Sequence, residues 1–301
     1  SPSLSIIREN KILLLLFVAF TAIAPLRDLQ SQGIFVGFRK AECSFLQRIM
    51  SLARIFIVPF LTPLGALGIY VSFGLAPVLT FIAGIFLTTR IFPYKLIPVV
   101  KREIINDIFH FSLGNYLARI FEGLPNFVLP IMVVNLLGAE RNAYFYIAWQ
   151  ISMLLLTVPQ FTSMSLLAEG SYNRGELGRN MKKAAKFIFL LLGAAIIGIF
   201  LIGKYILRIF GEDYARNSFE LLLILVLGSI PFAFNALYAS VKRIQKEIKP
   251  VILVYGGIAI ITLVASYLLM QSIGLVGIGI AWVIGNGVVA GEISVMKLIQ
   301  R

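Results

Sequence analysis

Residues 184–207 read AAKFIFLLLGAAIIGIFLIGKYIL, a continuous apolar run in which Lys186 and Lys204 are the only charged residues. A helix that crosses the hydrocarbon core of a bilayer needs about 20 predominantly apolar residues. The run meets this requirement, so we predict that it forms one membrane-spanning helix.

Similar runs recur along nearly all of the 301 residues, which are 59% hydrophobic and 14% charged. Soluble domains are roughly 45–50% apolar and about 25% charged. We therefore predict an all-α fold, a polytopic integral membrane bundle of nine transmembrane helices. The first span is expected to end at Pro25, and the fourth to bend at Pro125 and Pro130. The eight further spans are predicted at residues 12–26, 43–61, 64–92, 104–137, 143–168, 219–240, 251–270 and 275–298.

Basic residues outnumber acidic residues by 27 to 14, which gives a net charge of +13. If the spans alternate in direction, 19 of the 27 fall on one side of the membrane and six on the other. The positive-inside rule makes the richer side cytoplasmic, together with loop 171–183 and the C-terminus. This topology explains the basic charge without a nucleic-acid partner. It also places Ser1 outside, so we expect that an odd number of helices precedes it.

Enzyme chemistry has little support in this sequence. Cys43 and His110 are the only residues of their types, so no cysteine or histidine cluster can hold a metal. There is no glycine-rich phosphate loop and no catalytic serine, histidine and aspartate set. We expect no enzyme activity, no catalytic residues, no metal and no cofactor.

The fourth span carries a polar stripe. Asn115, Arg119, Glu122 and Asn126 are spaced at i, i+4, i+7 and i+11, so they share one helix face. A polar stripe on a membrane helix is expected to face a cavity or the bundle interior. Either Arg119 binds an anion that is released when Glu122 protonates or pairs with it again, or the two form a structural ion pair.

Four further residues are candidate substrate ligands. Arg54 lies midway in the second predicted span, where its guanidinium could bind phosphate oxygens or reach the cytoplasmic headgroups instead. Tyr116, Trp149 and Gln150 could stack on sugar rings and hydrogen-bond to them. The alternative for the aromatic residues is an interfacial aromatic belt.

The last span has a second pattern. Gly277, Ala281 and Gly285 recur every four residues. Small residues at this spacing let the backbones of membrane helices approach closely. The alternative is that the glycines only bend the helix.

Six stretches carry short patterns of glycine and aromatic residues within apolar sequence. They are FSLGNYLARIFEGLPNFVLPIMVVNLLGAERNAYFYIAWQ (111–150), VPQFTSMSLLAEGS (158–171), LRIFGEDYARNS (207–218), IGLVGIGIAW (273–282), QGIFVGFRKAE (32–42) and PLGALGIYVSFGLAP (63–77). In their order and spacing, the chain resembles the polysaccharide flippases of the multidrug/oligosaccharidyl-lipid/polysaccharide (MOP) exporter superfamily. The resemblance covers about 90% of the chain and rests on no single motif.

The resemblance implies a MATE-like architecture of two six-helix lobes. Residues 1–100 would be the last three helices of a truncated N-terminal lobe, and residues 101–301 the complete C-terminal lobe. The implied function is to flip a polyprenyl-diphosphate-linked oligosaccharide across the cytoplasmic membrane for surface polysaccharide biosynthesis.

In that function Arg54 and Arg119 would hold the diphosphate, and H⁺ or Na⁺ would be the coupling ion. The partners would be the lipid bilayer and the lipid-linked saccharide. Two alternatives remain open. One is a drug or cation exporter of the same superfamily, and the other is a structural membrane protein that transports nothing.

Overall fold

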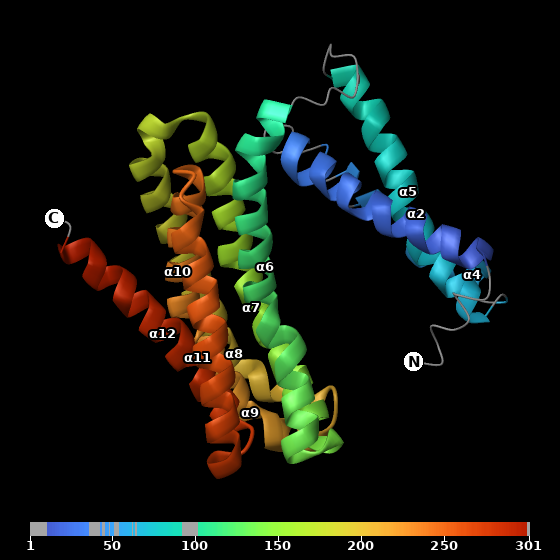
Figure 1. Ribbon diagram of the computed structural model, residues 1–301. Coiled ribbons are helices and arrows are strands. Elements are labelled where there is room, and N and C mark those ends of the chain that lie inside the picture. The colour runs from blue at the N-terminus through green and yellow to red at the C-terminus, as the bar shows by residue number, and fades with distance from the viewer. Residues whose placement is uncertain are drawn as a thin grey trace. The chain divides into compact units, whose positions relative to one another are not determined.

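The computed structural model describes residues 11–35, 43, 46, 47, 49, 50, 54–61, 63, 65–91 and 102–299. Every regular element in this part of the chain is a helix (Figure 1). The chain divides into two compact units, Ser1–Val99 and Val100–Arg301, which we call unit 1 and unit 2.

Unit 1 is built around α5 (Gly65–Ile91), which packs against α2 (Lys11–Asp28) and α4 (Arg54–Leu61). A π-helical segment, η1 (Leu29–Phe35), continues directly from α2. The expectation that the first span ends at Pro25 is wrong, because α2 continues through this proline to Asp28. A membrane helix tolerates proline because neighbouring groups can satisfy the carbonyl that loses its partner.

Unit 2 holds seven α-helices and one short 3₁₀ turn. The helix α7 contacts α6, α8, α9 and α10, whereas α11 contacts α6, α10 and α12 (Figure 1). Two of these helices, α9 and α10, meet at Gly228 and together make one 33-residue span, Glu212–Ile244. The elements are α6 (Arg102–Leu137), α7 (Ala139–Tyr172), η3 (Arg174–Glu176), α8 (Leu177–Arg208), α9 (Glu212–Leu227), α10 (Ser229–Ile244), α11 (Ile248–Ile273) and α12 (Val276–Ile299).

Eight segments of the described residues are long and apolar enough to cross a membrane. They coincide with eight of the nine predicted spans, which confirms the all-α, multi-pass membrane fold. The remaining predicted span, residues 43–61, lies partly outside the described residues. The helix described within it is α4. The fourth span, α6, runs helical through Pro125 and Pro130.

The surface of unit 2 suits lipid. On α8, Ile188 and Leu192 are buried against the bundle, whereas Leu190 and Leu201 are about 70% exposed. Apolar side chains therefore lie on both sides of this helix, as expected of a helix whose outer face contacts hydrocarbon chains.

The small-residue face of α12 packs as predicted. A Cβ on Gly277 would come within 2.7 Å of the Leu269 backbone, and one on Gly285 would overlap the Thr262 hydroxyl. Ala281, between them, is fully buried. Glycine is needed at both positions because α11 and α12 touch there, so the interpretation of close helix packing is confirmed.

Candidate functional site

The polar stripe of α6 lies partly on the surface of unit 2. Asn115 and Glu122 are half-buried, whereas Arg119 and Asn126 are exposed. Tyr116, one position after Asn115, is 63% exposed. The stripe is therefore accessible from one side, and its half-buried members contact the neighbouring helices.

Asn115 is held by a residue that the sequence analysis did not select. The Arg243 Nε, in the last turn of α10, donates a hydrogen bond to the Asn115 Oδ1 over 3.1 Å. The guanidinium also lies over the ring of Tyr255 on α11, with 5.5 Å from its Cζ to the ring centroid. Three helices thus orient one arginine through a charge-assisted hydrogen bond and a cation–π contact.

A glycine makes this arrangement possible. A Cβ on Gly114 would lie 2.6 Å from the Ile248 Cγ1, at the start of α11. Ile248 is β-branched, so its Cγ atoms are close to the backbone and cannot move far aside. Glycine at position 114 therefore lets α6 lie close to α11, next to Asn115.

Glu122 completes what we call the charged cluster, consisting of Asn115, Arg119, Glu122, Arg243 and Tyr255. Its carboxylate lies within electrostatic range of Arg243 and of Arg119. In the described part of the chain neither arginine forms an ion pair within 4.0 Å of this carboxylate. The cluster thus holds two guanidinium groups and one carboxylate, with a net formal charge of +1.

The Trp149 indole lies inside unit 2. Trp149 is 2% exposed, and its Nε1 donates a hydrogen bond to the Asn126 Oδ1 over 2.8 Å. Its ring meets that of Trp282 edge to face at a centroid distance of 5.2 Å. Trp149 and Asn126 thus satisfy each other by a hydrogen bond. Because the indole is buried, it presents no open face on which a sugar ring could stack.

The remaining predicted ligands are Gln150, Tyr116 and Arg54. Gln150 is exposed on α7. Arg54 is the first residue of α4 in unit 1, and its side chain lies outside the described part of the structure. The proposed roles of Gln150 and Arg54, together with that of Tyr116, stay predictions.

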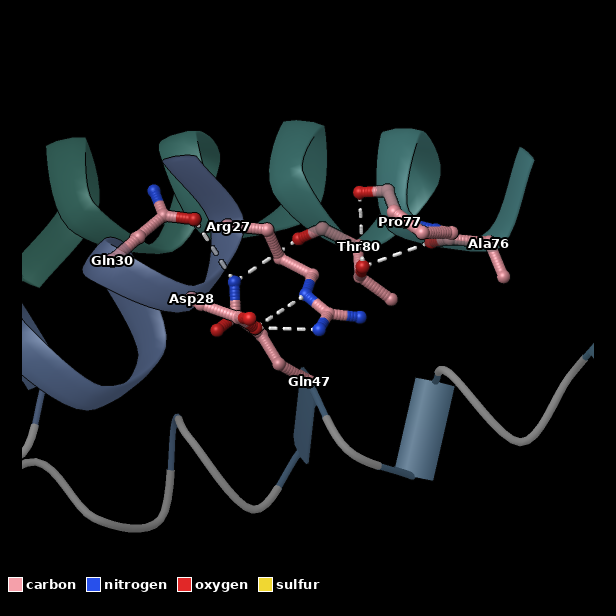
Figure 2. Close-up of polar contacts among 7 residues, drawn as sticks. All are labelled: Arg27, Asp28, Gln30, Gln47, Ala76, Pro77 and Thr80. Carbon is pink, nitrogen blue, oxygen red and sulfur yellow. Dashed lines mark hydrogen bonds and ion pairs between the residues drawn. The ribbon is translucent and has the colours of Figure 1, made fainter. Parts of the chain in front are cut away.

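Unit 1 contains a buried polar network that the sequence analysis missed. The Gln47 Nε2 donates to the Gln30 Oε1 and to the Thr80 carbonyl, at 3.0 Å each (Figure 2). Gln30 follows the ion-paired Arg27 and Asp28 and lies in the π-helical segment η1 (Figure 2). All three network residues are at most 5% exposed. Glutamines hydrogen-bonded in this way fix how η1 packs on α5, since an unpaired buried amide is costly.

Metal binding has no support in the described residues, which contain no group of three histidine, cysteine, aspartate or glutamate side chains that could hold an ion. What the charged cluster can do chemically is bind an anion. Two arginines offer fork-shaped donor sets that match phosphate or carboxylate oxygens.

No protein-family model matches the chain. A curated protein of Shigella flexneri named "Putative O-antigen transporter" is 26% identical over 201 residues, which are 61% of this chain and 47% of that protein. The chain therefore spans about half the length of this curated relative.

Several solved structures share the fold. A crystal structure of a MATE transporter matches with a TM-score of 0.77 at 19% identity, over 94% of this chain and 71% of that chain. An outward-facing multidrug resistance MATE family transporter of the MOP superfamily gives 0.72 at 20% identity, over 90% and 66%. A MOP superfamily transporter from Pyrococcus furiosus gives 0.76 at 21% identity, over 91% and 66%.

These similar proteins are transporters and not enzymes, in agreement with the sequence-based expectation. The chain is a multi-pass α-helical membrane protein with the fold of the MATE transporters of the MOP superfamily.

Proposed function

We propose that the chain forms the larger part of a membrane transporter that flips a polyprenyl-diphosphate-linked oligosaccharide between leaflets. The observation that carries this proposal is the charged cluster, in which Arg119 and Arg243 come from two helices and both lie within electrostatic range of one carboxylate, Glu122. A site with surplus positive charge on membrane-spanning helices suits an anionic group that must leave water.

Arg243 is the better oriented of the two arginines. Its Nε donates to Asn115, and its guanidinium lies over the ring of Tyr255. A guanidinium fixed in this way can meet two phosphate oxygens at once at little further cost in conformational entropy. Arg119 is exposed and would close on the diphosphate from the side of α6. Arg54 stays a candidate diphosphate ligand on the sequence alone.

The position of the cluster along the helices supports loading from the cytoplasmic leaflet. Arg243 lies in the last turn of α10, immediately before the loop that carries Lys246. The positive-inside rule assigns basic loops of this kind to the cytoplasm. The lipid diphosphate is proposed to enter at this end, and its saccharide would pass through the bundle as the two lobes change their exposure.

Glu122 would control release. Its carboxylate competes with the diphosphate for both guanidinium groups, so it can neutralise them once the substrate has left. The driving force is proposed to come from a coupling ion, H⁺ or Na⁺. The similarity to the O-antigen transporter supports a lipid-linked saccharide as the cargo.

A drug or cation exporter is the second candidate, and the fold shared with multidrug MATE transporters favours it. A cationic substrate needs an unpaired intramembrane carboxylate, and Glu122 is the one that the cluster offers. In that case Arg119 and Arg243 would weaken binding instead of providing it.

The two candidates differ in which charge is essential. The experiment measures surface polysaccharide, normalised to folded protein, in a flippase-deficient strain that carries the full-length protein. For a diphosphate substrate, Arg119→Ala and Arg243→Ala abolish transport, Arg119→Lys retains part of it, and Glu122→Gln is milder. The matched control is Arg216→Ala, an exposed arginine on α9. No restoration of surface polysaccharide by the wild type, together with drug efflux that Glu122→Gln abolishes and both arginine variants retain, would instead establish a cation exporter.

A further inference from the structure

A groove of about 450 Å³ lies between α7 and α8, away from the charged cluster's residues. This volume is within the range of roughly 300–1,000 Å³ that is common for small-molecule sites. Phe161 and Phe187 line it and are 56% and 52% exposed. The groove therefore opens on the apolar outer surface of unit 2.

The two ends of the groove differ in chemistry. Because α7 and α8 are consecutive and antiparallel, Phe161 and Phe187 line one end, and Glu169 and Asn180 line the other, with Ser165 and Lys183 between them. The Ser165 hydroxyl and the Asn180 amide have no hydrogen-bond partner among the described residues. One end is therefore an apolar wall. Towards the other end the groove offers three donor groups, one of them a cation, beside the Glu169 carboxylate.

The polar end lies at headgroup depth. The 17 residues from Phe187 to Gly203 contain no charge. At a rise of about 1.5 Å per residue they span about 25 Å, close to the thickness of the hydrocarbon core. Lys183 and Asn180 lie one to two turns outside this stretch, at the level where phospholipid phosphates are found.

The charge around this end is net positive. None of the ion pairs in the described part of the chain involves Lys182, Lys183 or Lys186. Glu169 is the single acidic residue of the lining, and it already has an interaction partner. The three lysines therefore outnumber the one carboxylate around this end.

We propose that this groove binds an acidic phospholipid of the surrounding bilayer. The phosphate contacts Lys183, Asn180 and Ser165, and one acyl chain lies against Phe161 and Phe187. Basic residues at the bilayer surface attract acidic lipids electrostatically. Here an apolar groove also accommodates an acyl chain. This site is independent of the transported substrate.

The test is lipid retention in native mass spectrometry of the purified 301-residue chain in detergent. Phosphatidylglycerol and phosphatidylcholine are added at equal concentration, and polyprenyl phosphate in a parallel sample. Phosphatidylglycerol is expected to be retained preferentially. Lys183→Glu reverses one charge and is expected to weaken its retention about tenfold or more.

Two kinds of variant separate the groove from general surface charge. Lys182→Glu and Lys204→Glu make the same charge change at exposed positions of α8 that do not line the groove, and should lower retention less than about threefold. Ser165→Trp fills the groove without changing charge and should lower retention as strongly as Lys183→Glu. Melting temperatures in detergent are measured for every variant. If Lys183→Glu does not fold, lipid retention in Ser165→Trp tests the proposal in its place.

Three results would overturn the proposal. Equal retention of the two phospholipids would remove the role of charge. Equal losses in Lys182→Glu and Lys183→Glu, or full retention in Ser165→Trp, would remove the role of the groove. Preferred retention of polyprenyl phosphate would assign the groove to the transported lipid instead.

Discussion

Arg243 donates a hydrogen bond to Asn115 over 3.1 Å although 128 positions separate the two residues in the sequence. The bond joins the end of α10 to the polar stripe of α6. Hydrogen bonds to charged groups contribute roughly 1.5–3 kcal/mol. The orientation of Arg243 should therefore depend measurably on one amide side chain.

Replacing Asn115 by alanine is predicted to lower transport by about tenfold or more, because Arg243 loses the acceptor that orients it. The measurement is surface polysaccharide per folded protein in the full-length context. Asn217→Ala is the matched control, since both amides also donate to the carbonyl four residues earlier, of Phe111 and Asp213 respectively. Arg243→Ala added to Asn115→Ala should cost less than it does alone.

The Trp149–Asn126 pair is predicted to act on stability. Trp149→Phe removes the indole N–H and leaves the Asn126 amide oxygen without its donor, at a cost of roughly 1 kcal/mol in the free energy of unfolding. Thermal unfolding in detergent checks this. Asn126→Ala should lower the melting temperature as well, and the double variant should lose less than the sum of the two.

Transport per folded protein separates this structural role from sugar binding by Trp149. We expect it to stay near the wild-type level in Trp149→Phe, because the buried ring is replaced by another aromatic ring. An additive double variant, or a loss of transport without a loss of stability, would contradict the structural role.

Gly114→Ala is predicted to destabilise unit 2 by roughly 1–3 kcal/mol, because the added methyl meets the Ile248 side chain at 2.6 Å. Thermal unfolding should show rescue by Ile248→Ala, which removes the clashing atoms. Gly193→Ala on α8 is the control, since nothing lies within 4 Å of its Cβ. It should be neutral, or stabilising by up to about 1 kcal/mol through helix propensity. A tolerated Gly114→Ala would mean that α6 and α11 are less closely packed.

The topology can be tested with single cysteines. In a background without Cys43, a cysteine at exposed Asn173, between α7 and α8, is predicted to resist an impermeant thiol reagent in intact cells. A cysteine at Asp213, in the first turn of α9 and just beyond the opposite end of α8, should react readily. Reversed labelling of the two would reverse the orientation of the whole chain.

The sequence predicts the helices well because long apolar runs are a strong signal for membrane-spanning helices. Apolar runs of spanning length fix α5, α7 and α11 to within a few residues. The expected end at Pro25 is wrong, because it rests on the rule that a proline breaks a helix by removing a backbone donor. In a membrane helix neighbouring groups can satisfy the freed carbonyl, and α2 continues to Asp28.

The candidate site was harder to predict because its contacts are long-range. Helical spacing brings Asn115 and Glu122 to one face, which the sequence can show. Arg243 looks like an ordinary basic residue at a membrane boundary, and only the packing of α10 against α11 brings it over Tyr255. Trp149 could not be assigned to core or cavity, because apolar side chains cover both faces of a membrane helix.

The contact between α11 and α12 bears on how the chain is made. Only Gly274 and Leu275 separate the two helices, and Gly285 leaves the space that the Thr262 hydroxyl occupies. Thr262 is fully buried in the folded unit. Bringing together two helices this close in sequence costs little loop-closure entropy. The two can therefore pair as a hairpin during membrane insertion, before the remaining helices assemble around them.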